Sequence, residues 1–260
     1  MIERNYNPIK HGIKEGKRFI ASWCQAASNI TAEVLADSGM DILIIDCEHA
    51  PSSFETLIRQ QQAMNGYKAV PFARAPWNDF VQIKKILDTG MYGILVPYVE
   101  TREEAEKAVE AVKYPPFGVR GVAGSTRAAH FGNNSIDYFT KANDEVMVFI
   151  AIESKKGIDN LDGILSVEGL DGVFVGPVDL ATNLGHLGNP NFPDVQDAIS
   201  AVEKKVLDSG KVLMALGGDW EGTKRKLDSG AQIVIAMSDT TTLGSIAREN
   251  VKKSREYVNG

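Results

Sequence analysis

The chain alternates short apolar runs with longer amphipathic stretches over its whole length. Eight runs rich in Val, Ile and Phe predict strands near 18–23, 41–46, 69–74, 92–97, 147–153, 172–176, 211–216 and 232–237. Continuous apolar runs of this kind are typical of parallel strands buried on both faces. Helix-compatible segments separate them at intervals of roughly 20–30 residues. The repeated unit is therefore a strand followed by a helix.

Four of the predicted helices end in Asp-Ser-Gly or Asp-Thr-Gly directly before a strand, at 37–39, 88–90, 208–210 and 228–230. A glycine just after a helix accepts the left-handed conformation that caps its carboxyl end. Eight strand–helix units predict an α/β fold, a (β/α)8 barrel that forms a single domain over residues 1–260. A doubly wound open sheet is the alternative, weakened because no Gly-x-Gly-x-x-Gly turn follows the first strand.

Composition excludes several classes of partner. The 260 residues carry a net charge of −6 without any run of Lys or Arg, so a nucleic-acid partner is not expected. No apolar stretch reaches the roughly 18 residues of a membrane span, and the N-terminus lacks the apolar core of a signal peptide. Cys24 and Cys47 have neither metal-binding spacing nor a disulfide framework. These features predict a cytoplasmic protein without a membrane partner.

Two strands in the middle of the chain end next to a carboxylate. Glu153 follows the run 147–152, and Asp179 follows the run 172–176 after Pro177 and Val178. In parallel α/β folds the carboxyl ends of the strands form the ligand-binding edge. Two acids there predict oxygen ligands for Mg²⁺ or Mn²⁺, whereas the alternative is that they cap the helices that follow. No lysine ends a strand at this edge, which disfavours Schiff-base chemistry and favours a metal.

Other side chains at the same edge suggest acid–base and charge-stabilising roles. Trp23, His49 and Arg74 each lie at or just beyond the end of a predicted strand. His49 lies near Asp46 and Glu48, which can orient an imidazole and tune its basicity, although a lone histidine is usually structural. Arg74 closing an apolar strand needs a carboxylate partner, either from substrate or in a structural salt bridge.

The irregular stretch 114–134 is too long for a routine connection from a strand to a helix and is predicted to be functional. Arg127 and His130 in this stretch are candidates for binding a distal carboxylate or hydroxyls of a substrate. They can equally be solvated loop residues.

These residues lie in motifs that closely resemble the HpcH/HpaI family of metal-dependent pyruvate aldolases, class II enzymes of the phosphoenolpyruvate/pyruvate barrel superfamily. The motifs are Ile-Asp-Cys-Glu-His-Ala-Pro (45–51), Trp-Asn-Asp (77–79), Tyr-Pro-Pro-Phe-Gly-Val-Arg-Gly (114–121), Ile-Glu (152–153) and Val-Glu-Gly-Leu-Asp-Gly-Val-Phe-Val-Gly-Pro-Val-Asp-Leu (167–180). The similarity runs from about residue 16 to the last helix, so it covers nearly the whole chain.

The resemblance implies a role for each site residue. Glu153 and Asp179 would bind a divalent metal ion, Mg²⁺, Mn²⁺ or Co²⁺. Arg74 would stabilise an enolate oxygen, His49 would be the acid–base residue, and Asp88 would raise the basicity of that histidine. The remaining substrate-binding residues are predicted to be Gly176, Pro177, Val178, Asp179, Trp23 and Arg127, the backbone near 176–178 holding the pyruvate carboxylate.

The implied reaction is the reversible cleavage of a 4-hydroxy-2-oxo acid, of the diacid or sugar-acid type, to pyruvate and an aldehyde through a metal-stabilised enolate. The alternatives are an oxaloacetate-type decarboxylase at the same site and a barrel that binds a keto acid without turning it over. The resemblance also implies a homo-oligomer, a hexamer.

Three positions qualify the resemblance. Asp88 belongs to one of the helix endings described above, which places it toward the opposite end of the barrel, so Asp46 is the better-placed partner for His49. Ala151 replaces a Gln that the family usually has. It is predicted to face the ligand-binding end of the barrel because it shares a strand face with Glu153. Met237 replaces a common Gly and is predicted to fill the barrel interior.

Overall fold

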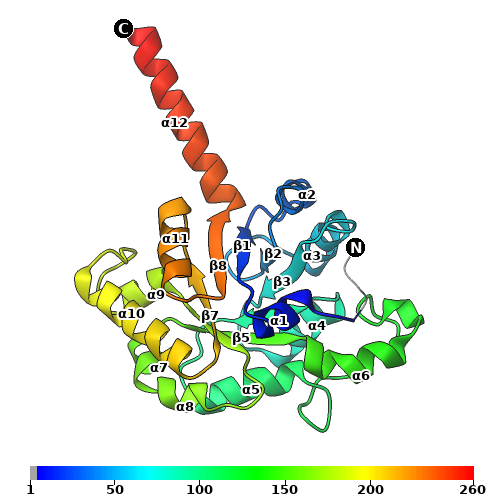
Figure 1. The fold of residues 1–260 in the computed structure, drawn as a ribbon. Helices are drawn as coiled ribbons and strands as arrows, with labels where there is room; N and C mark the ends of the chain where they lie inside the picture. The colour runs from blue at the N-terminus through cyan, green and yellow to red at the C-terminus, as the bar shows by residue number, and fades with distance from the viewer. Residues whose placement is uncertain (1–4) are drawn as a thin grey trace.

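The computed structural model describes residues 5–260 and shows a closed barrel of eight parallel strands surrounded by helices (Figure 1). The strands are β1 (Phe19–Cys24), β2 (Ile42–Asp46), β3 (Val70–Arg74), β4 (Gly93–Val96), β5 (Met147–Ile152), β6 (Gly172–Val175), β7 (Val212–Leu216) and β8 (Ile233–Ser238). Each strand pairs with the next, and β8 pairs with β1. The predicted (β/α)8 barrel is confirmed, and each strand boundary lies within about two residues of its prediction.

Helix α1 precedes the first strand, and at least one helix follows each strand. The helices are α1 (Pro8–Lys14), α2 (Asn29–Asp37), α3 (Phe54–Ala63), α4 (Phe80–Asp88), α5 (Arg102–Val112), α6 (Ser135–Glu145), α7 (Lys155–Asp159), α8 (Leu161–Leu165), α9 (Pro177–Asn183), α10 (Pro193–Asp208), α11 (Trp220–Asp228) and α12 (Asp239–Asn259). The glycines predicted to end four of them, at 39, 90, 210 and 230, all have positive φ angles, between 77° and 105°. The local helix-ending signal therefore holds at every predicted site.

Two ends of the barrel differ in what covers them. Ile9 of α1 packs against the interior cluster, and the Asn7 side chain donates to the carbonyl oxygens of Tyr92 and Glu145, just before β4 and β5. Helix α1 therefore closes the end where the strands begin. At the other end, α12 starts from the carboxyl end of β8 and extends away from the barrel (Figure 1).

Side chains alternate between the barrel interior and the layer under the helices, as the period of two requires. On β5, Met147, Phe149 and Ala151 belong to the interior cluster, whereas Val148 and Ile150 pack outward. Glu153 continues the inward set beyond the end of the strand. The orientation predicted for Ala151 is thus confirmed: it lies one layer below Glu153 and is fully buried.

Met237 does not fill the barrel interior, so that prediction is wrong. The pairing of β8 with β1 shifts register after Ala21, so that Ser22 pairs with Met237 instead of Ala236. Ser22 points outward, and Met237 accordingly packs against the cluster under the helices. A bulge adds one residue to a strand and reverses the facing of the residues beyond it.

The stretch 114–134 lies on the path from a helix to the next strand, rather than on the path from a strand to a helix. It joins α5 to α6, and α6 ends directly before β5, with a short 3₁₀ turn at His130–Gly132. Because the stretch follows α5 and precedes β5, it lies at the end of the barrel where the strands begin.

Candidate active site

The carboxyl ends of five strands bring together most of the predicted site residues. Strand β1 carries Trp23, β2 ends at Asp46, β3 ends at Arg74, and Glu153 follows β5 by one residue. Asp179 lies in the first turn of α9, which begins directly after β6. We call this end of the barrel the mouth.

Arg74 is held rigidly between acids and an aromatic ring. Its Nε and Nη2 donate to the two carboxylate oxygens of Asp46 at 2.9 and 2.6 Å, and its Nη1 lies 3.0 Å from Glu48 Oε2. The guanidinium carbon lies 4.5 Å from the centre of the Trp23 ring. Burial opposes the ionisation of Asp46, but the hydrogen bonds from Arg74 outweigh it, and the pKa of Asp46 is lowered. Arg74 is therefore a fixed, buried positive charge.

Glu153 is placed by backbone groups from two other strands. Its Oε2 accepts a hydrogen bond of 2.9 Å from the amide of Tyr98, just beyond β4. Its other oxygen lies against Gly176, where a Cβ atom would come within 2.3 Å of Oε1. Only glycine leaves room for the carboxylate there, which explains why Gly176 follows β6 directly.

The acids of the mouth are under-compensated by positive charge. Burial, reinforced by Glu48 and Asp179, raises the pKa of Glu153 to about 7, against the lowering influence of the Tyr98 amide and Arg74. Burial together with Asp46 and Asp179 likewise raises the pKa of Glu48 to about 7, although Arg74 lowers it. A site that resists ionisation of its carboxylates is suited to an added cation.

The residues present fit a divalent metal ion with open coordination positions. Glu153 and Asp179 offer hard oxygen donors, and across residues 5–260 no three His, Cys, Asp or Glu side chains form a ready cage for a metal. A metal held by two carboxylates needs water or substrate to complete its ligands, which is the usual arrangement for Mg²⁺. Two carboxylates of this kind are therefore compatible with a divalent metal ion that has open coordination positions.

His49 lies at the mouth but is not oriented by Asp46. The Asp46 carboxylate accepts the backbone amides of Glu48 and His49, at 3.0 and 3.3 Å, and leaves the imidazole free of it. The ring nitrogen Nε2 lies 3.6 Å from Glu48 Oε2, and 58% of the side chain is exposed. The carboxylate within ion-pair distance of the His49 ring is therefore that of Glu48 and not that of Asp46.

Asp88 does not meet His49 within the chain. It ends α4, at the end of the barrel where the strands begin, and its Oδ1 accepts a hydrogen bond of 3.0 Å from Arg120 Nη2. Arg120 is fully buried, with its guanidinium over the rings of Tyr114 and Tyr138. The local helix-ending motif decides the position of Asp88, as its sequence indicated.

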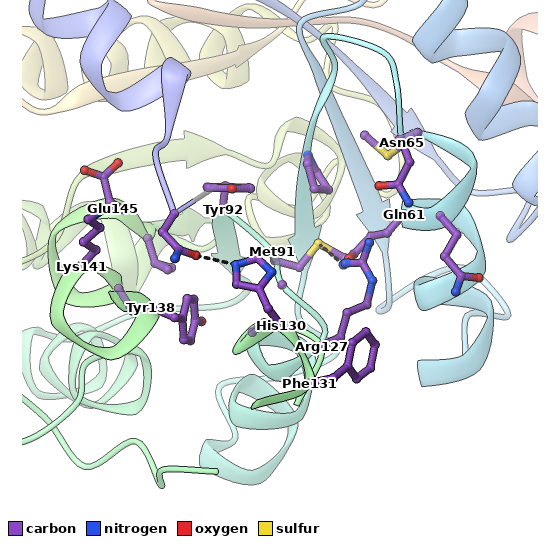
Figure 2. A pocket seen from close by; sticks show the side chains of 18 of the residues that line it. Gln61, Asn65, Met91, Tyr92, Arg127, His130, Phe131, Tyr138, Lys141 and Glu145 are labelled. Atoms are coloured by element: carbon purple, nitrogen blue, oxygen red, sulfur yellow. Dashed lines mark hydrogen bonds between the residues drawn. The ribbon is translucent and has the colours of Figure 1, made fainter. Parts of the chain in front are cut away.

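Arg127 and His130 also lie away from the mouth, in a cavity of about 540 Å³ near the start of β4 (Figure 2). Arg127 Nη1 donates to the carbonyl of Thr89 at 2.7 Å and to the side chain of Gln61. His130 Nε2 lies 3.0 Å from Asn5 Oδ1. These contacts correct the expectation that Arg127 binds substrate at the mouth of its own chain.

Two residues that donate hydrogen bonds to the predicted acids of the mouth, Gln25 and Tyr98, were not themselves predicted. Gln25 Nε2 donates to Asp46 Oδ2 at 3.1 Å, and Ser238 Oγ donates to Gln25 Oε1 at 2.8 Å. Tyr98 contributes its amide to Glu153. Neither contact leaves a local signal, because the partners are separated by 21 and 55 residues in the chain. The position just past a strand end was the one available clue.

Comparison with known proteins identifies the family of this chain. A family model described as HpcH/HpaI aldolase/citrate lyase matches residues 20–244. The 4-hydroxy-2-oxo-heptane-1,7-dioate aldolase of Escherichia coli is 43% identical over 241 residues, which are 93% of this chain and 92% of that protein. The crystal structure of an HpcH/HpaI aldolase/citrate lyase family protein from Burkholderia cenocepacia J2315 superimposes with a TM-score of 0.91 and 32% identity, covering 96% of this chain and 99% of that one.

A further solved structure, that of the citrate synthase SbnG, superimposes with a TM-score of 0.86 and 28% identity, covering 96% of this chain and 98% of that one. The chain belongs to the HpcH/HpaI aldolase/citrate lyase family, and the resemblance drawn from its motifs is confirmed.

Proposed function

We propose that this protein is a divalent-metal-dependent aldolase that reversibly cleaves a 4-hydroxy-2-oxo acid into pyruvate and an aldehyde. The observation that carries the proposal is the buried, under-compensated carboxylate of Glu153, held by Tyr98 and Gly176 beside Asp179 and the fixed charge of Arg74. The 43% identical Escherichia coli relative is named for this reaction on 4-hydroxy-2-oxo-heptane-1,7-dioate.

Glu153 and Asp179 are the residues proposed to hold the metal ion, which is Mg²⁺, Mn²⁺ or Co²⁺ in this proposal. When bound, such an ion supplies positive charge to the 2-oxo and carboxylate oxygens of the substrate. Among residues 5–260, no side chain caps the start of α9, so the backbone near Gly176, Pro177 and Val178 is available to bind the pyruvate carboxylate.

Bond cleavage assigns a role to each remaining residue. As the bond between C3 and C4 breaks, His49 accepts the proton of the 4-hydroxyl group and the aldehyde carbonyl forms. The electron pair stays with C3, and negative charge develops on the 2-oxo oxygen. Arg74 keeps positive charge near that oxygen without reorganising, because Asp46 and Trp23 hold it in place. Protonation of C3 then yields pyruvate.

The enolate half of this reaction is tested by following the exchange of pyruvate methyl protons by NMR, in D₂O with Mg²⁺. We expect exchange that EDTA abolishes, together with pyruvate release from a 4-hydroxy-2-oxo acid. Glu153→Gln should lose both. A barrel that only binds keto acids would bind pyruvate but leave its protons unexchanged, which would refute the proposal. Carbon dioxide release from oxaloacetate without any aldol cleavage would favour the decarboxylase alternative.

Assembly and location complete the proposal. The projecting helix α12 exposes Leu243, Ile246 and Val251, each more than half accessible, which supports a homo-oligomer, as a hexamer in this proposal. Cys24 and Cys47 are both unpaired, which suits the cytoplasm. In residues 5–260, no helix has the length and apolar character needed to cross a bilayer.

A further inference from the structure

Two aromatic rings stack at the mouth without a part in the chemistry described above. Trp77 lies between β3 and α4, and Tyr98 lies two residues beyond β4. The ring centres are 6.1 Å apart and the planes are inclined by 26°. Trp77 is 56% exposed, so residues 5–260 leave much of this large apolar side chain uncovered. We call these two residues the aromatic wall.

The position of Tyr98 is fixed relative to the proposed metal ligand. Its φ angle is 54°, in the left-handed region that residues with a side chain rarely adopt. Its amide donates to Glu153 Oε2 at 2.9 Å, and this contact helps to keep the backbone in that conformation. Residues held in sparsely populated conformations often mark functional positions. The hydrogen bond from the Tyr98 amide therefore fixes the position of the aromatic wall relative to the Glu153 carboxylate.

The wall lies between the two halves of the proposed catalytic site. Strand β4 is paired to β3, which ends at Arg74, and to β5, which leads to Glu153. A substrate held by both Arg74 and Glu153 must therefore lie next to the end of β4.

Polar groups beside the wall are already engaged. The Glu100 carboxylate accepts from Ser154 Oγ at 2.6 Å and from Lys156 Nζ at 3.0 Å. The Asn78 side chain donates to the carbonyl of Glu104 at 2.9 Å. A substrate hydroxyl placed against the rings would lose hydrogen bonds to water and find few replacements among these groups, whereas methylene or ring carbons would gain contact.

We propose that Trp77 and Tyr98 contact the aldehyde half of the substrate and select aldehydes whose carbonyl is followed by methylene or ring carbons over aldehydes that carry hydroxyls there. This inference rests on the proposed function. One extra methylene in an apolar pocket changes specificity about 10-fold or more. We expect a difference of that size between matched aldehydes.

The test compares condensation of pyruvate with propanal and with glyceraldehyde, which have the same number of carbons, in the presence of Mg²⁺. The quantity measured is the ratio of the two kcat/KM values in each variant divided by the wild-type ratio, so that the intrinsic reactivity of the aldehydes cancels. Trp77→Ala and Tyr98→Asn should each lower the preference for propanal about 10-fold, and Trp77→Phe should largely keep it. Asn is chosen because it tolerates the left-handed conformation.

Phe131→Asn is the matched control. Phe131 also has a left-handed backbone, with φ 55°, and is exposed, but it lines the cavity near the start of β4, away from the mouth (Figure 2). The ratio of kcat/KM for propanal to kcat/KM for glyceraldehyde in Phe131→Asn should equal the wild-type ratio. Circular dichroism confirms that each variant is folded before its rates are compared.

Pyruvate proton exchange separates failure of this inference from failure of the proposed function. If wild-type protein exchanges pyruvate protons but Trp77→Ala and Tyr98→Asn leave the aldehyde ratio unchanged, the wall does not contact the aldehyde and the inference is wrong. If wild-type protein exchanges no protons, the proposed function itself fails.

Discussion

Glu153 should make the metal-free protein less stable as the pH rises. The carboxyl group is 3% exposed, and its pKa is raised from 4.5 to about 7. Since the folded pKa lies above the unfolded one, the native state binds more protons than the unfolded state between these values. The free energy of unfolding therefore falls as the pH rises through this window, and the full penalty is present above it.

The size of the effect follows from the same shift. One pKa unit corresponds to about 1.4 kcal/mol, so ionised Glu153 lowers the free energy of unfolding by about 3 kcal/mol at pH 8. Between pH 5 and pH 8 the loss is about 2.5 kcal/mol, because part of it is already present at pH 5. For a chain of this length that loss lowers Tm by roughly 5–10 °C.

Chemical or thermal unfolding in EDTA at pH 5 and pH 8 measures this loss. Glu153→Gln keeps the shape of the side chain but removes its charge, so the variant should lose less stability than wild type between the two pH values and be the more stable protein at pH 8. Added Mn²⁺ should stabilise wild type at pH 8 and have little effect on the variant, because metal binding requires the ionised carboxylate.

Glu203→Gln is the matched control, since Glu203 is also buried but is bound by Lys226 Nζ. Removing this attractive pair should lower stability instead of raising it at pH 8. The reasoning is refuted if wild type and Glu153→Gln show the same dependence on pH in EDTA, or if Glu153→Gln is the less stable at pH 8.

Three further predictions concern activity. EDTA should abolish aldol cleavage and Mn²⁺, Mg²⁺ or Co²⁺ restore it; full activity in EDTA would contradict the metal assignment. Arg74→Lys loses the paired hydrogen bonds to Asp46, so kcat should fall about 10²–10³-fold. The metal affinity of this variant, measured by titration calorimetry, should change little. Ala151→Gln adds a donor below Glu153 and should lower the KM for pyruvate up to ~10-fold. An unchanged or higher KM would show that pyruvate is not bound there.

The sequence by itself determined the architecture and most of the mouth. Strand positions follow from apolar runs, and helix ends follow from glycines that adopt positive φ, and both signals act within a few residues of the chain. Acids that directly follow strands, such as Glu153, must lie at one end of a parallel barrel once the fold is known. The family motifs then connect these positions to a chemistry.

The tertiary structure decided which groups meet across the barrel. A bulge in β8 turns Met237 outward, and the segment between α5 and α6 holds Arg127 at the end opposite the mouth. Asp46 binds Arg74 instead of the His49 ring, and the Tyr98 amide reaches Glu153. These outcomes depend on strand register and on contacts between residues far apart in the chain, and neither leaves a periodic or local signal in the sequence.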